Sequence, residues 1–261
     1  MKEVIKAMFR SVGLDVRRIQ RAPEPDETVP ASPRRPIGNI ELFLQDIKAR
    51  GFVPRGIIDV GANLGLWTRM ALSVFPDARV LMIEPLDEMQ RSLSRLVKER
   101  PACSYVNAGA GRQDGESTLT ISWNLVSGSF LPDAETELLA SGQQRRTRMV
   151  TIDTLLRGAF GDFEPDLVKL DIQGFELEAL AGGESLFGRT EVFILETSLF
   201  SFKPRSPITR ECISFMADRE YELYDITEYL RRPLDGALGQ IDIAFVKRHG
   251  MFRRDGRWIV E

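Results

Sequence analysis

The chain has 261 residues, of which 43% are hydrophobic and 28% charged, and its formal net charge is −3. This composition is typical of a soluble globular protein with one large or two small domains, and it lacks the basic charge that nucleic-acid binding favours. No apolar stretch is long enough to span a bilayer. The two cysteines show neither a disulfide framework nor metal-binding spacing. The sequence therefore predicts a cytoplasmic protein without a nucleic-acid partner.

Residues 1–37 differ in character from the rest of the chain. Residues 1–21 contain six basic and two acidic side chains, and apolar residues recur at three- and four-residue spacings up to Gly13. This pattern predicts a basic amphipathic helix, which a proline-rich linker follows. We expect the helix to pack on the domain. The alternative is peripheral contact of residues 1–21 with the inner face of a membrane.

Helices and strands alternate from residue 38 to about residue 250. Apolar periodicity predicts, in chain order, a helix at 38–50, a strand at 56–60, a helix at 65–75, a strand at 79–84, a helix at 87–98, strands at 104–107, 117–122 and 167–171, a helix at 175–187, a strand at 192–196, a helix at 208–219, and strands at 221–226 and 241–247. This alternation predicts an α/β fold with a Rossmann-like, doubly wound, mostly parallel sheet of about seven strands. The last two strands lack a crossover helix between them, so we expect an antiparallel final strand. Residues 251–261 would form a C-terminal tail.

The segment 115–150 interrupts this alternation. It combines a strand of alternating polarity, a turn rich in serine and glycine, and the aromatic residues Trp123 and Phe130. An insertion of this kind above a cofactor crevice is a candidate lid that binds the acceptor. Its two aromatic rings could stack on a flat acceptor or fill the core of the insertion, and the sequence favours neither.

The turn from Asp59 to Gly65 joins the strand 56–60 to the next helix. Its sequence, D-V-G-A-N-L-G, supplies glycines and an asparagine that accept positive φ and allow close approach to the backbone, as a nucleotide-like cofactor requires. The spacing differs from the dinucleotide pattern G-x-G-x-x-G, and Asp59 would repel a phosphate. S-adenosylmethionine carries an ammonium and a sulfonium but no phosphate. The turn therefore favours this cofactor over NAD.

Three further carboxylates end predicted strands at the same edge of the sheet. Glu84 lies 25 residues after Asp59 and could accept both hydroxyl protons of a ribose. Asp171 and Glu196 could position an acceptor hydroxyl, accept its proton or hold a divalent cation, and we predict them as the catalytic pair. Two carboxylates are an incomplete ligand set, so we predict no metal site. Asp171 could instead cap the following helix. Lys169 shares the face of Asp171, and we expect it to be paired or peripheral.

Together these segments resemble the FkbM family of methyltransferases. The resemblance spans about residues 40–200 and is carried by the turn with Thr68, the strand-end Glu84, the segment V-T-I-D-T-L-L at 150–156 and the block V-K-L-D-I-Q-G-F-E-L-E-A-L at 168–180. Members of the family are S-adenosylmethionine-dependent enzymes with the class I Rossmann-like fold, and many methylate hydroxyl oxygens. Gln173 departs from the family pattern, which often has glutamate at this position.

The resemblance implies a methyltransferase domain over residues 38–250 and a role for each matching residue. The methionine part of the cofactor would be surrounded by Asp59, Gly61, Asn63 and Gly65, its carboxylate by Thr68, its ribose by Glu84 and its adenine by Asn107 and Ala108. The implied activity is O-methylation of a hydroxyl on a sugar, glycan or small molecule. Two alternatives stay open: an NAD-dependent oxidoreductase or epimerase on a similar fold, and a non-catalytic Rossmann-like binding protein.

Overall fold

The computed structural model describes residues 36–122, 125, 128–131 and 135–257. The predicted N-terminal helix, most of its linker and Trp123 lie outside the described residues. Within this part of the chain, no helix is long and apolar enough to cross a membrane.

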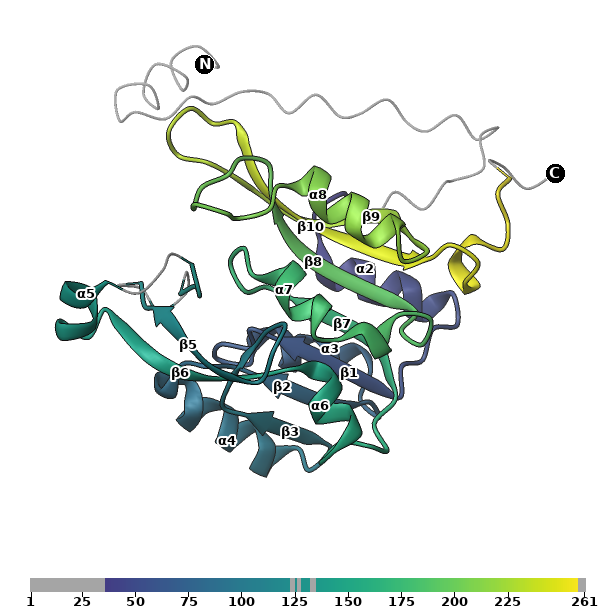
Figure 1. Cartoon of the computed structure of the whole chain (residues 1–261). Helices are drawn as coiled ribbons and strands as arrows, with labels where there is room; N and C mark the ends of the chain where they lie inside the picture. Colours follow the sequence, from purple (N-terminus) through teal and green to yellow (C-terminus); the bar gives the residue numbers. More distant parts are fainter. Residues whose placement is uncertain (1–35, 123–124, 126–127, 132–134, 258–261) are drawn as a thin grey trace, which may run out of the picture. The chain divides into compact units, whose positions relative to one another are not determined.

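A seven-stranded sheet lies at the centre of the domain, in the order β3-β2-β1-β7-β8-β10-β9 (Figure 1). Its strands are β1 (Gly56–Val60), β2 (Arg79–Ile83), β3 (Cys103–Val106), β7 (Pro165–Leu170), β8 (Val192–Ser198), β9 (Tyr221–Arg231) and β10 (Leu238–Lys247). The pairs β2–β3, β1–β2, β1–β7 and β7–β8 are parallel, whereas β10 is antiparallel to both β8 and β9. The predicted doubly wound, mostly parallel sheet with an antiparallel final strand is confirmed.

Helices cover both faces of this sheet, because successive apolar residues of each strand point to opposite faces. Ile57 belongs to a core that includes Phe43 of α2 (Ile40–Ala49), Ala71 of α3 (Leu66–Val74) and Leu93 of α4 (Gln90–Glu99). Its neighbour Ile58 belongs to the opposite core, which includes residues of α6 (Ile152–Arg157), α7 (Glu176–Ala181) and α8 (Thr209–Ala217). Both faces of the central strands are therefore closed to solvent, and their carboxyl ends are left to form a site.

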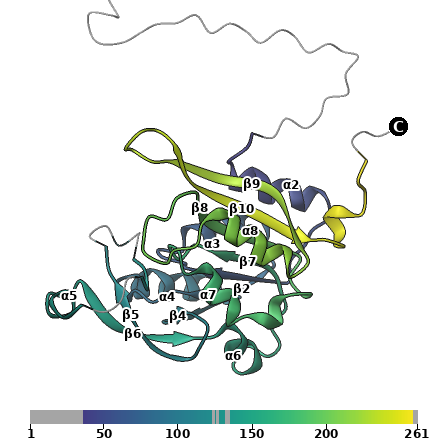
Figure 2. The ribbon, with the colours of Figure 1, turned by 45° about the horizontal axis from the view of Figure 1, so that its top comes forward.

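The insertion, together with a short strand that precedes it, forms a second, three-stranded sheet at one side of the first (Figures 1 and 2). It consists of β4 (Gly109–Ala110), β5 (Gly115–Thr120) and β6 (Gln144–Val150), with α5 (Thr136–Ala140) between the last two. The strand β6 was not predicted. It reads Q-R-R-T-R-M-V, and its arginines mask an alternation in which Thr147 and Met149 are buried while Arg146 and Arg148 are exposed.

The strands predicted at 221–226 and 241–247 are longer in the structure, because β9 ends at Arg231 and β10 begins at Leu238. Two further predictions also differ in their limits. The helix predicted at 175–187 is α7 followed by a separate 3-10 turn, η2 (Glu184–Leu186). The break falls at Gly182, where a β-carbon would lie 2.0 Å from the carbonyl oxygen of Gly111. The start of the predicted tail is the 3-10 turn η3 (Met251–Arg253), and its Phe252 ring packs 5.8 Å from the ring of Phe52. The beginning of the tail is thus packed on the domain.

Candidate functional site

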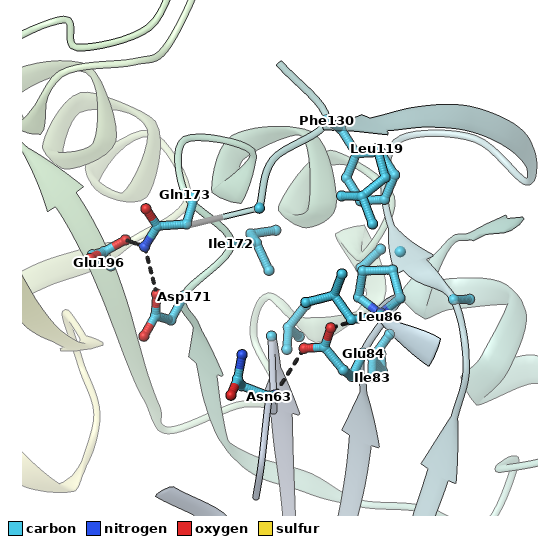
Figure 3. Close-up of a pocket in the computed structure, with 17 residues that line it drawn as sticks. Asn63, Ile83, Glu84, Leu86, Leu119, Phe130, Asp171, Ile172, Gln173 and Glu196 are labelled. Carbon is cyan, nitrogen blue, oxygen red and sulfur yellow. Dashed lines mark hydrogen bonds between the residues drawn. The ribbon is translucent and has the colours of Figure 1, made fainter. Parts of the chain in front are cut away.

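A cavity opens beyond the carboxyl ends of β1, β2, β7 and β8, between the main sheet and the insertion (Figure 3). Six of the ten predicted site residues line it: Gly61, Asn63, Glu84, Ala108, Asp171 and Glu196. Its walls also contain apolar side chains, among them Leu86, Leu119 and Phe130. The cavity therefore combines a row of carboxylates with an apolar wall that the insertion partly supplies.

The turn after β1 has the positive φ values that its sequence requires. Gly61, Asn63 and Gly65 have φ of 83°, 45° and 76°. A β-carbon on Gly61 would lie 2.1 Å from the carbonyl oxygen of Asp171, so the backbone of the β7 end demands glycine here. Asn63 donates from its backbone N–H to Glu84 Oε2 at 2.9 Å and from its side-chain amide to the carbonyl of Leu125 at 2.9 Å. The turn is thus fixed to β2, β7 and the insertion.

Glu84 points into the cavity from the end of β2 (Figure 3). Its carboxylate is 4% exposed and accepts one backbone N–H on each oxygen, from Asn63 and from Leu86, both at 2.9 Å. Burial raises the pKa of Glu84 to about 7, although these two hydrogen bonds act to lower it. Each oxygen retains acceptor capacity, so the side chain can still bind a hydroxyl pair.

Asp59 and Thr68 lie beneath the turn, outside the cavity lining. Asp59 is fully buried, and its Oδ2 accepts a hydrogen bond of 2.5 Å from the Thr68 hydroxyl. Burial raises the pKa of Asp59. Its Oδ1 has no hydrogen-bond partner among the described residues. In this structure Thr68 therefore binds Asp59, and the proposed contact of either residue with a cofactor stays a prediction.

Lys169 is a buried cation next to Asp59. The two residues are register partners on β1 and β7, and the Lys169 ammonium lies 2.8 Å from Asp171 Oδ2. Burial would lower the pKa of Lys169, but the carboxylates of Asp171 and Asp59 outweigh burial and raise it. The expectation that Lys169 is paired is confirmed.

Gln173 joins the two predicted catalytic carboxylates (Figure 3). It adopts φ of 59°, and its amide nitrogen donates to Glu196 Oε2 at 2.7 Å and to Asp171 Oδ1 at 3.3 Å. A second amide, from Gln240, donates to Glu196 Oε1 at 3.0 Å. A glutamate at position 173 would add a third negative charge here, so the amide allows the two carboxylates to be held together.

The two carboxylates have opposite pKa shifts. Burial acts to raise the pKa of Asp171, but the Lys169 ammonium outweighs burial and holds that pKa below its usual value. Burial, reinforced by the negative charge of Asp171, raises the pKa of Glu196 well above its usual value. Asp171 is therefore the member of the pair that more readily stays ionised, and Glu196 is the member that more readily binds a proton.

Asp171 is not a helix cap. The helix α7 begins at Glu176, and the position before it is Phe175. Glu176 itself accepts the free backbone N–H groups of this loop, from Ile172 at 3.0 Å and from Gly174 at 3.1 Å. The capping alternative for Asp171 is therefore wrong for this structure, and its carboxylate is left to face the cavity and Lys169.

Asp242 is an acid near the site that the sequence did not single out. It is the register partner of Glu196 on β10, is 8% exposed, and burial raises its pKa to about 7. The signal in the sequence was a lone acid inside the apolar run of the predicted strand 241–247. The side chains that lie next to Asp242 depend on the register of the antiparallel strand, and the sequence does not reveal this register.

The remaining predicted residues lie at the edges of the cavity. Asn107 does not line it and donates to Asp87 Oδ1 at 2.7 Å, whereas its neighbour Ala108 does line it. From the insertion, Ser129 donates to the carbonyl of Gln173 at 3.0 Å, and Phe130 packs 5.5 Å from Phe175. The insertion thus covers one side of the cavity, and whether it binds an acceptor stays a prediction. Among the described residues, no group of three or more His, Cys, Asp or Glu side chains could hold a metal ion.

Comparisons with known proteins identify the family of the chain. A family model, the methyltransferase FkbM domain, matches residues 59–223. The methyltransferase sdnD of Sordaria araneosa is 30% identical over 153 residues, which are 48% of this chain and 59% of that protein. The chain thus spans 59% of the length of this relative.

Solved structures are similar at lower identity. The FkbM methyltransferase from Methylobacillus flagellatus KT has a TM-score of 0.47 and 17% identity, with 73% of this chain and 43% of that chain covered. A 1,6-didemethyltoxoflavin-N1-methyltransferase from Burkholderia thailandensis, solved with S-adenosylhomocysteine, has a TM-score of 0.44 and 12% identity, with 80% of this chain and 78% of that chain covered.

Proposed function

The chain belongs to the FkbM methyltransferase family, and we propose that it transfers a methyl group from S-adenosylmethionine to a hydroxyl oxygen. The acceptor that we propose is a sugar, a glycan or another small hydroxylated molecule. The cavity at the carboxyl edge of the sheet would bind both substrates.

The charge of the cavity lining carries the cofactor assignment. Three carboxylates line it, from Glu84, Asp171 and Glu196, and none of its described lining residues is a lysine, arginine or histidine. A dinucleotide would bring a pyrophosphate next to these carboxylates without a cation to offset it. A cofactor with a sulfonium and an ammonium group has the opposite charge, and the lining fits it.

The lining residues divide into three groups around such a cofactor. Glu84 would accept the ribose hydroxyls, Gly61 and Asn63 would border the methionine part, and Ala108 with the apolar wall would enclose the adenine. When bound, S-adenosylmethionine supplies a methyl group that its sulfonium already activates. The chain's own task is then to align the acceptor hydroxyl and to remove its proton.

Asp171 and Glu196 suit this task in different ways. Glu196 has the raised pKa of a competent proton acceptor, and the amides of Gln173 and Gln240 hold it in place. Asp171, kept ionised by Lys169, would orient the acceptor by accepting a hydrogen bond from a second, neighbouring hydroxyl. A second cavity next to Gln173 is lined by polar and aromatic side chains that suit a hydroxylated acceptor, namely Ser198, Phe202, Lys203, Ser206 and Gln240.

Isothermal titration with S-adenosylhomocysteine, and separately with NAD, tests the cofactor assignment. We expect S-adenosylhomocysteine to bind and NAD not to bind. Glu84→Ala should weaken S-adenosylhomocysteine binding by about 1–3 kcal/mol, because a buried acceptor of hydrogen bonds is lost. Binding of NAD alone, or no S-adenosylhomocysteine binding at high micromolar concentration, would contradict the proposal.

A further inference from the structure

Exposed apolar side chains gather at one end of the β9–β10 hairpin. Among the twelve large hydrophobic residues that are exposed in the described part of the chain, six lie in the hairpin end and in the loop after β8, namely Tyr229, which is 52% exposed, and five others. The five others are Leu199, Phe200, Phe202, Leu230 and Leu234, with exposed fractions of 37%, 37%, 48%, 61% and 83%. We call these five residues the apolar tip. Isolated exposed apolar residues are normal in proteins, whereas a cluster of them indicates a binding surface.

The apolar tip is an ordered part of the fold. The backbone N–H of Leu199 donates to the carbonyl of Gly239 at 2.8 Å, which attaches the loop to the hairpin. The Phe200 and Phe202 rings lie 5.7 Å apart, and the Arg232 guanidinium lies 4.1 Å from the centre of the Phe200 ring. The exposed rings are therefore held in position before any partner arrives.

The hairpin end extends beyond the rest of the sheet. In β10, the pairing with β8 ends at Gln240, whereas the hairpin continues through Leu230 to a turn at residues 232–237. Figures 1 and 2 both show this end of the hairpin projecting beyond the main sheet, with the loop after β8 beside it. A projecting end can insert into the surface of a lipid bilayer, which the broad faces of the domain could not do.

The tip is also basic, in contrast to the whole chain. Residues 199–207 and 229–238 contain four basic side chains (Lys203, Arg205, Arg231 and Arg232) and one acid (Asp235), a formal charge of +3 in a chain of −3. Asp235 is bound to Arg232. Arg231 is exposed and forms no ion pair with another described residue; its guanidinium donates to the carbonyl of Gly236 at 2.9 Å. Apolar side chains with basic neighbours complement a surface that is apolar inside and negative outside.

We propose that the apolar tip docks the protein on the surface of an anionic lipid bilayer. The aromatic and leucine side chains would enter the boundary between headgroups and acyl chains, while Arg231 and Arg232 stay at the level of the lipid phosphates. Phe202 and Lys203 also line the second cavity, next to Gln173 and Gln240. The mouth of that cavity would consequently face the membrane. Docking does not depend on which reaction the site catalyses.

Co-sedimentation of the full chain with vesicles tests this proposal. The vesicles contain phosphatidylcholine alone or phosphatidylcholine with roughly one-third phosphatidylglycerol. We expect binding to the anionic vesicles and a loss of about fivefold or more in the bound fraction for the double variant Leu230→Ser/Leu234→Ser. Arg231→Glu should weaken binding to anionic vesicles and leave any binding to neutral ones unchanged.

A matched control separates the tip from other membrane contacts. The double variant Ile37→Ser/Val53→Ser removes apolar residues that are 68% and 73% exposed elsewhere, and it should bind vesicles as the unaltered chain does. Thermal unfolding of all variants confirms that they fold. The proposal is wrong if the tip variant binds as well as the control, or if the unaltered chain does not bind anionic vesicles. Concentration-dependent dimerisation that the tip variant abolishes, without vesicle binding, would instead identify a second copy as the occupant.

Discussion

The protonation of Glu84 should control the binding of the nucleoside part of the cofactor. Burial places the pKa of Glu84 at about 7, so at pH 6 about one tenth of this carboxyl is ionised and at pH 8 about nine tenths. Only the ionised form can accept two ribose hydroxyl protons while it also accepts the two backbone N–H groups. The affinity for a nucleoside should therefore rise about tenfold, or about 1.4 kcal/mol, between pH 6 and pH 8.

Calorimetry with 5′-methylthioadenosine isolates this effect, because the compound shares the adenosine of the cofactor and carries neither its ammonium nor its sulfonium. Glu84→Gln should bind more weakly at pH 8 and should show no dependence on pH. The reasoning is refuted if the unaltered protein binds equally at both pH values, or if Glu84→Gln keeps the same slope.

The same pKa has a consequence for the stability of the protein without ligand. The unfolded chain ionises Glu84 near its ordinary pKa, whereas the folded chain holds the proton up to about pH 7. The contribution of Glu84 to stability is thus fully present below the unfolded pKa and is lost as the pH rises through the folded pKa. Relative to Glu84→Gln, the unaltered protein should lose unfolding free energy between about pH 4.5 and pH 7, which urea titrations at several pH values would measure.

Three other substitutions test the structural account. Lys169→Met should lower the unfolding free energy by about 3–5 kcal/mol in urea titrations, because it leaves Asp171 and its acidic neighbours without their buried cation; a loss below about 1 kcal/mol would contradict the role of this ion pair. Gly61→Ala should destabilise more than Gly51→Ala, since both glycines have positive φ but only Gly61 faces a backbone oxygen at 2.1 Å, and equal changes in Tm would contradict this reason. Glu196→Gln should reduce methyl transfer about 10²- to 10⁴-fold and leave S-adenosylhomocysteine affinity unchanged; a parallel loss of both would assign Glu196 to cofactor binding.

Much of the fold could be predicted because its strands carry strong local signals. The strands β1, β2, β7 and β8 are apolar runs that end in a carboxylate or a glycine turn, and the structure places them where the periodicity does. The strand β6 was missed because its arginines hide the alternation of buried residues. The helix predicted at 175–187 was too long because it was continued across Gly182 and Gly183, a pair that ends helices, and the contact of Gly182 with Gly111, 71 positions earlier, has no signal in the sequence.

In the site, too, residues with a local sequence signal could be predicted, and residues placed by tertiary pairing could not. Glu84, Asp171 and Glu196 could be placed together because parallel strands bring their carboxyl ends to one edge. Asp242 and Gln240 could not, because they reach Glu196 from an antiparallel strand whose register is set by tertiary pairing. Gly61 lines the cavity, and the space that a β-carbon at this position would occupy is filled by the backbone of Asp171, a long-range contact that the sequence does not reveal. Sequence reasoning thus found the carboxylates that end parallel strands, and it missed the partners that hold them.

Methyl transfer itself tests the central claim most directly. The full chain is incubated with S-adenosylmethionine labelled in its methyl group and with separate polysaccharide, lipid-linked and small-molecule fractions of a cell extract, with Glu196→Gln as the parallel control. The account predicts labelled product in at least one fraction, bound through an ether linkage that survives mild base, and almost none with the variant. Label on nitrogen, sulfur or a carboxyl group, or no transfer by a chain that binds S-adenosylhomocysteine, would contradict it.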